Sequence, residues 1–352
     1  MPPRRVLHWR RLVRSVMKLL GLVLVAGLLG VGGQLAAETC TTQSQMKDAE
    51  RNLLANSAAM LAAKIEANDT DGVKALAIPD YRNNFTAMAN VITAVSTHLK
   101  GAQPEVEQVY LLDASTLAKP AAGGNPDAQF FCSLNKSPNE TEFSIPQLPP
   151  GAYAFAMVRM ESPSPWRLSL LLRQEAGQWL LAGLYPKQLT AAGHDGLWYW
   201  QQARALAAQK QPWNAWLYFQ EAQSLLFPTS FISSTHLDKL QTETTAAMPP
   251  AVSGGINADE PLVVKAADGT EFRFTALGVN DSLNADKVDI AAHIKIDELG
   301  DPAAARKRNI DAATALLAAH PELRQSFHGV WVVADAPGQN PYVTQLAMAE
   351  IK

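Results

Sequence analysis

The sequence contains residue types that catalyse reactions, but their spacing matches no catalytic motif. It has no His-Glu-x-x-His metal motif, no Gly-x-Ser-x-Gly nucleophile turn and no glycine-rich phosphate loop. His194 directly precedes Asp195, and adjacent helical residues do not face each other, so we expect Asp195 to cap a helix. His293 lies four residues before Asp297, which is expected beyond the end of its strand. The sequence predicts no catalytic residue, no metal ligand and no cofactor. It favours a non-enzymatic protein, and an enzymatic function is the alternative.

Aromatic residues form the most suggestive cluster in the chain. Seven lie within the 22 residues 198–219: Trp198, Tyr199, Trp200, Trp213, Trp216, Tyr218 and Phe219. Trp and Tyr dominate the energetics of protein interfaces, so the cluster indicates a partner-binding surface. Alternatively, it forms the core of a helical pair. Trp198, Trp200 and Trp213 fit a helical seam less well than Tyr199 and Phe219, so we predict that at least one of these three is exposed and contacts a partner.

The first 37 residues have the order of a secretory signal peptide. Six basic residues and no acidic one precede an apolar run at 19–31, and Leu35, Ala36 and Ala37 follow it. The run is shorter than the roughly 20 residues that span a membrane, so we predict cleavage after Ala37. The alternative is a retained inner-membrane anchor, which would be the only membrane contact. In both cases the remainder is exported, as a periplasmic or secreted bacterial protein.

Export also determines what the two cysteines, Cys40 and Cys132, are expected to do. In an oxidising compartment two cysteines favour one disulfide, although two free thiols stay possible. Closing a loop of about 90 residues would stabilise the fold by roughly 4 kcal/mol in the chain-entropy model. The chain has no Cys-x-x-Cys, which argues against a redox role.

The charge balance excludes one class of partner. The net charge is −3, and the first 37 residues hold six of the 30 basic residues and none of the 33 acidic ones, so the rest of the chain carries −9. Nucleic-acid binding needs a basic surface, so we expect no nucleic-acid partner.

The periodicity of apolar residues predicts an α+β protein. Helical periodicity covers 46–68, 73–77 and 81–99, and strand-like segments follow at 106–112, 129–134, 153–160, 166–173 and 179–185. Helices followed by a run of antiparallel strands form an α+β layer, in which the apolar face of the sheet packs against the helices.

Residues of about 46–192 resemble the NTF2-like superfamily of cone-shaped α+β domains. The likeness rests on the first helix ending in NDTDG at 68–72, on Leu76, Pro79 and Tyr81, and on the late strands WRLSL at 166–170 and GQWLLAG at 177–183. The resemblance implies a cone that can enclose an apolar pocket, used by some relatives as isomerases, cyclases or dehydratases and by many only for binding. Catalytic relatives place His, Asp or Tyr inside the cone. The strands here carry arginines and no histidine, and Asp80 could line the cone mouth or cap a helix.

Residues 193–240 are expected to hold a helical pair, broken at Gln211-Pro212, and a short further helix. The spacing resembles one tetratricopeptide repeat, with small residues at Ala203, Ala215 and Ala222, large ones at Tyr199 and Leu206, and Phe219 before Pro228. Gln202 departs from the family pattern. Because one repeat cannot form an independent solenoid, we expect the pair to pack on the neighbouring α+β domain.

Residues 241–260 are rich in Thr, Pro, Ser and Gly and are predicted to form an interdomain linker. The last segment, 261–352, is predicted as a separate small α+β domain in the order β-β-β-α-β-β, with its helix at 302–319 and a hairpin turn at Asp268-Gly269. The sequence as a whole favours an exported cell-envelope protein that binds a protein or peptide partner. The alternative is a small-molecule binder, isomerase or lyase that uses the cone.

Overall fold

The computed structural model describes residues 38–118, 120, 123–133, 140–280 and 286–352. The predicted signal peptide lies outside the described residues. No helix in the described part of the chain is long and apolar enough to cross a membrane.

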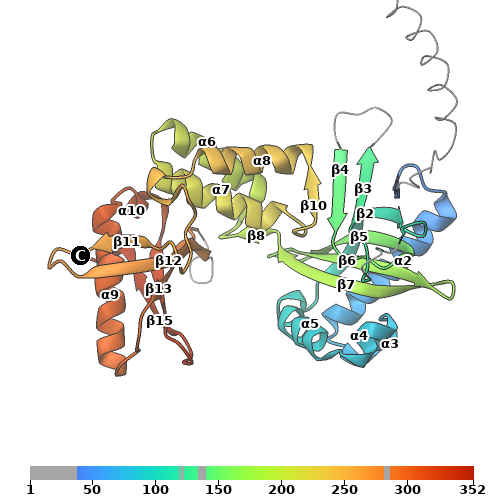
Figure 1. Ribbon diagram of the computed structural model, residues 1–352, viewed down its shortest axis with the longest axis horizontal. Helices are drawn as coiled ribbons and strands as arrows, with labels where there is room; N and C mark the ends of the chain where they lie inside the picture. The colour runs from blue at the N-terminus through green and yellow to red at the C-terminus, as the bar shows by residue number, and fades with distance from the viewer. Residues whose placement is uncertain (1–37, 119, 121–122, 134–139, 281–285) are drawn as a thin grey trace, which may run out of the picture. The chain divides into compact units, whose positions relative to one another are not determined.

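A five-stranded antiparallel sheet organises the first half of the described chain (Figure 1). Its strands run in the order β1 (Thr39–Thr42), β2 (Gln103–Asp113), β5 (Ala152–Glu161), β6 (Trp166–Glu175) and β7 (Gln178–Gln188). The strand-like pattern predicted β2, β5, β6 and β7. Strand β1 is too short to show a period, and it forms because residues 39–42 pair with residues 110–113 of β2.

Helices cover one face of this sheet. They are α2 (Asp48–Glu66), α3 (Thr70–Ala75), α4 (Pro79–Asn83) and α5 (Thr86–Leu99). On α2 the fully buried Leu54, Ala58, Leu61 and Ile65 lie on one face and pack against the sheet in a shared apolar core. The single helix expected at 81–99 is wrong: Asn84 leaves helical geometry at φ −137°, and Phe85 is buried where α5 begins. The non-helical backbone at Asn84 therefore separates α4 from α5.

A smaller sheet packs on the opposite face. It consists of β10 (Ile232–Ser234), β4 (Glu140–Ile145) and β3 (Ala128–Ser133). Phe130 and Phe143 are fully buried against Phe155 of the larger sheet. The sequence did not predict β4, because most of its residues are polar and only Phe143 and Ile145 are buried.

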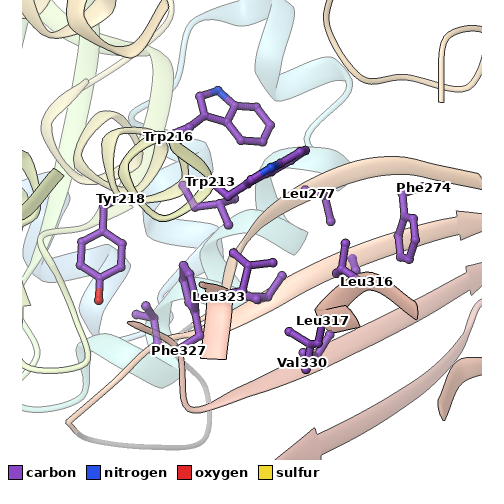
Figure 2. Packing of buried hydrophobic residues seen from close by; sticks show 14 of the residues in the cluster. Trp213, Trp216, Tyr218, Phe274, Leu277, Leu316, Leu317, Leu323, Phe327 and Val330 are labelled. Atoms are coloured by element: carbon purple, nitrogen blue, oxygen red, sulfur yellow. The ribbon is translucent and has the colours of Figure 1, made fainter. Parts of the chain in front are cut away.

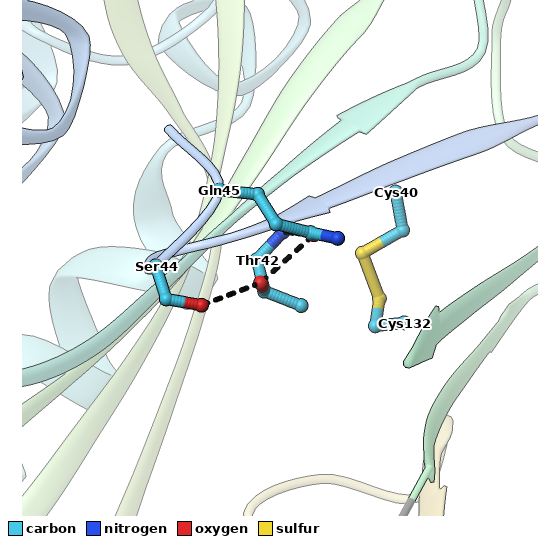
Figure 3. Close-up of a disulfide and its surroundings, with 5 residues drawn as sticks. All are labelled: Cys40, Thr42, Ser44, Gln45 and Cys132. Carbon is cyan, nitrogen blue, oxygen red and sulfur yellow. Dashed lines mark hydrogen bonds between the residues drawn. A yellow bond between two sulfur atoms is a disulfide. The ribbon is translucent and has the colours of Figure 1, made fainter. Parts of the chain in front are cut away.

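The predicted disulfide is confirmed. Cys40 of β1 is bonded to Cys132 of β3, with the Cα atoms 5.2 Å apart, so the bond joins the two sheets (Figure 3). In the turn after β1 the Thr42 hydroxyl donates to Gln45 Oε1 at 2.8 Å and lies 3.2 Å from the Ser44 hydroxyl. Such a bond indicates an oxidising compartment.

The helical pair is present as predicted. After the short strands β8 (Thr190–Ala191) and β9 (His194–Asp195), α6 (Gly196–Ala208) and α7 (Pro212–Leu226) meet at a turn with Lys210 in left-handed geometry. Asp195 caps α6 as expected, since its carboxylate accepts from the Trp198 amide at 2.8 Å. A third helix, α8 (Thr235–Ala246), follows β10, so residues 241–246 of the segment expected as a linker are helical. Within that segment Thr244 and Val252 are buried.

The C-terminal segment has the predicted β-β-β-α-β-β order. Its sheet runs β11 (Leu262–Lys265), β12 (Glu271–Asn280), β13 (Asp289–Lys295), β14 (Gly329–Asp335) and β15 (Tyr342–Ala347). Only β13 and β14 pair in parallel, because the helical crossover α9 (Pro302–Ala319) connects them. A short helix, α10 (Leu323–Ser326), precedes β14.

The helical pair shares an apolar core with this C-terminal sheet. Trp213, Trp216 and Tyr218 of α7 belong to the same buried cluster as Leu323 and Phe327 (Figure 2). The Tyr218 hydroxyl donates to the Ser326 carbonyl at 3.0 Å, and the Asn214 amide donates to the Glu322 carbonyl at 2.8 Å. The expectation that the pair packs on the preceding α+β region is therefore incomplete, since this core lies on its C-terminal side.

Candidate functional site

The structure places the three tryptophans that the sequence singled out in different environments. Trp200 and Trp213 are 8% and 5% exposed, so neither is the exposed ring that we predicted for at least one of the three. Trp198 is half-buried and stacks on the His194 ring with centroids 3.7 Å apart. The reason is tertiary: α7 is covered by α6, α8 and the C-terminal sheet together, which buries more aromatic surface than one helical seam could. A partner-binding role for these residues stays a prediction.

Trp200 nevertheless lines a groove between α6 and α8. Leu197, Gln201 and Arg204 of α6 lie on one side, His236 and Lys239 of α8 lie on the other, and the groove encloses about 210 Å³. Leu197 is 54% exposed, one of the few large apolar side chains on the described surface. The groove therefore combines an exposed apolar side chain with three basic ones, and only Trp200 among its residues was foreseen.

A hydrogen-bonded network holds the groove in shape. Glu243 of α8 accepts from Trp200 Nε1 at 2.7 Å and from Arg204 Nε and Nη2 at 2.6 and 2.9 Å. The Arg204 guanidinium lies 4.4 Å from the Trp200 ring centroid, a cation–π distance. The hydrogen bond from Arg204 is the main cause that lowers the pKa of Glu243, and burial acts against it. These contacts preorganise both walls.

The electrostatics of the groove favour a negatively charged ligand. Glu243 neutralises Arg204 through the bidentate pair. Lys239 forms no ion pair within the part of the chain that the structure describes, and His236 lies beside it in the first turn of α8. The surplus charge is therefore positive, and the N-terminal end of α8 adds a partial positive charge.

Two histidine–aspartate pairs in the C-terminal sheet were missed by the sequence analysis. His328 Nδ1 lies 3.1 Å from Asp289 Oδ1, and His293 Nδ1 lies 3.0 Å from Asp335 Oδ2. Asp297 lies beyond the end of β13 at Lys295, as expected, and the partner of His293 is Asp335 of β14. Asp289 is 2% exposed, and its second oxygen accepts from Trp331 Nε1 at 3.0 Å, so this carboxylate anchors two side chains. Only the parallel register of β13 with β14 could have revealed these pairs.

The residues weighed for a cone mouth lie apart from the groove. Asp80 is exposed at the start of α4, and burial is the main cause that raises the pKa of the half-buried Tyr81. Among the described residues, no three His, Cys, Asp or Glu side chains come close enough to share a metal ion.

Comparison with known proteins adds no relative. No protein-family model, no curated protein and no solved structure matches the chain.

Proposed function

We propose that this is an exported, non-enzymatic binding protein of the bacterial cell envelope that takes an acidic peptide segment of a partner protein in the groove between α6 and α8. The single observation that carries the proposal is the composition of this groove. The exposed Leu197 and the edge of Trp200 offer apolar contact, while Lys239 offers a positive charge that no ion pair among the described residues neutralises, and the His236 ring can donate a hydrogen bond. A partner peptide with an acidic side chain next to an apolar one would match both the positive charge and the apolar surface of the groove.

Preorganisation supports binding at this place. The Glu243 network fixes Trp200 and Arg204 before a ligand arrives, so less conformational entropy is lost on association. The disulfide and the signal-like N-terminal segment are consistent with work outside the cytoplasm. The likeness of α6 and α7 to a tetratricopeptide repeat, and of residues 46–192 to an NTF2-like domain, belongs to the same proposal, as adaptor parts rather than catalytic ones.

The alternative, chemistry inside an NTF2-like cone, receives less support. The helix-facing side of the five-stranded sheet is occupied by buried apolar side chains, among them Leu61, Ile65 and Leu170, each 0–1% exposed. A filled interior of this kind leaves little room for a substrate.

A peptide selection tests the proposal. A phage-displayed library of random peptides would be selected on the purified exported protein and counter-selected on a Leu197→Asp, Lys239→Glu double variant. We expect enriched sequences that place Asp or Glu beside an apolar residue and that bind the double variant at least tenfold more weakly. Both substituted side chains are at the surface, so the melting temperature should not change. Enriched peptides that bind both proteins equally, or that lack acidic residues, would contradict the proposal.

A further inference from the structure

Two adjoining cavities are lined by residues of both sheets and of the α7–α8 region, and the outer one also by Arg51 of α2. The outer one encloses about 500 Å³ and is lined mainly by polar side chains, including Ser44, Gln108 and Thr235. The inner one encloses about 220 Å³. Tyr110, Thr141 and Ser234 line both, so the two cavities are neighbours. The outer volume is within the range of small-molecule sites.

The inner cavity is apolar apart from a few groups. Phe143, Phe155 and Met157 come from the two sheets, and Leu226, Ile232 and Leu237 come from the α7–α8 region. The rings of Tyr110 and Phe143 meet edge to face with centroids 5.1 Å apart, and Phe143 and Phe155 do so at 5.3 Å. Because Phe143 and Phe155 are fully buried, the half-buried Met157, Leu226 and Leu237 provide the apolar surface that a ligand can contact.

Arg167 places a cation in the wall of this apolar cavity. Its side chain is 17% exposed, and its buried Nε has no hydrogen-bond acceptor within 3.5 Å among the described residues. Glu107 Oε2 lies 3.6 Å from Nε, so it forms an ion pair with Arg167 at a distance slightly longer than a hydrogen bond. The cross-strand neighbours of Arg167 are Arg159 and Lys187, both basic. Burial is the main cause that lowers the pKa of Arg167, and its guanidinium still carries its charge near neutral pH.

A buried donor without an acceptor is costly, and an oxygen acceptor from a ligand would satisfy it. We infer that the inner cavity binds a small aromatic carboxylic acid, with its ring against Met157, Leu226 and Leu237 and its carboxylate on Arg167. The adjoining polar cavity accommodates substituents on the acid. The inner cavity shares no lining residue with the groove of the proposed function, whereas His236 lines both that groove and the outer cavity.

The test uses hydrocinnamate as the probe and isothermal titration calorimetry on the full exported chain. We expect binding to the unaltered protein with a Kd of about 1 mM or tighter. Hydrocinnamide, which has the same shape without the charge, should bind at least tenfold more weakly. Propanoate, which lacks the ring, should show no heat of binding. Failure of hydrocinnamate to bind at 10 mM, or equal binding of the amide, would overturn the inference.

Variants locate the site. Leu237→Trp fills the inner cavity and should weaken hydrocinnamate binding at least tenfold without lowering the melting temperature. Leu53→Trp is the matched control, because Leu53 is 51% exposed on α2 and lines neither cavity, and it should bind as the unaltered protein does. The Arg167→Gln variant should also bind hydrocinnamate at least tenfold more weakly than the unaltered protein. Should Arg167→Gln not fold, Leu237→Trp decides alone: unchanged affinity in that variant would refute the site.

Discussion

Replacing Trp213 by alanine should destabilise the protein strongly, because this side chain belongs to the core that α7 shares with the C-terminal sheet. Trp213 is 5% exposed. Its ring lies 5.9 Å from the Trp216 ring in an edge-to-face arrangement and 4.1 Å from the His320 ring. The substitution removes a large buried side chain and leaves a cavity that fixed neighbours cannot fill.

The expected loss is about 3–5 kcal/mol of unfolding free energy, the usual cost of deleting a buried Trp side chain. Urea denaturation followed by circular dichroism measures it. Hydrogen exchange should at the same time show faster exchange of amides in β12 and α10, which contact α7. The exchange pattern identifies where the lost stability resided.

Trp198→Ala serves as the matched control, since Trp198 is half-buried beside the same cluster. The Trp198→Ala substitution should lower the unfolding free energy by less than half as much as Trp213→Ala does. A loss below 1 kcal/mol for Trp213→Ala, or faster exchange confined to α6, would refute the shared core.

Three further predictions concern other parts of the chain. Burial lowers the pKa of His320, so the unfolded chain binds a proton at this ring more readily than the folded chain does. The unfolding free energy should therefore fall as pH drops below about 6.5. Urea titrations at pH 7.5 and 5 measure this fall, and the His320→Phe variant should show a smaller one. Reduction of the Cys40–Cys132 bond should lower stability by roughly 4 kcal/mol, measured by melting with and without dithiothreitol, and an unchanged melting temperature would contradict the bond's structural role. Gly329→Ala should cost about 1–3 kcal/mol, because the added Cβ would lie 2.5 Å from the Leu346 carbonyl oxygen; denaturation that matches the unaltered protein would contradict this close approach.

Elements with a strong local pattern were predictable from the sequence. The helix 302–319 matches α9 residue for residue, because Asp301 caps it and accepts from two backbone amides, and Pro302 opens it. The disulfide was predictable because a chain with only two cysteines has one possible pairing in an oxidising compartment.

Elements stabilised by distant partners were not predictable. Strand β10 is three residues long and forms because residues 232–234 pair with residues 141–143 of β4. The groove includes His236 and Lys239, which line it only because α8 packs beside α6 in the folded chain. The burial of Trp200 and Trp213 likewise depends on α8 and on the C-terminal sheet. The periodicity of apolar residues along α6 and α7 gives no information about these neighbours.

The charge of the α6–α8 groove is the central claim, and one titration tests it most directly. Fluorescence anisotropy would follow a labelled peptide from the selection as it binds the unaltered protein and the single variant Lys239→Glu. The account predicts a Kd at least tenfold weaker for the variant, about 1.4 kcal/mol, and a weakening of the unaltered complex as salt is raised. Equal affinity for both proteins, with no dependence on salt, would contradict it.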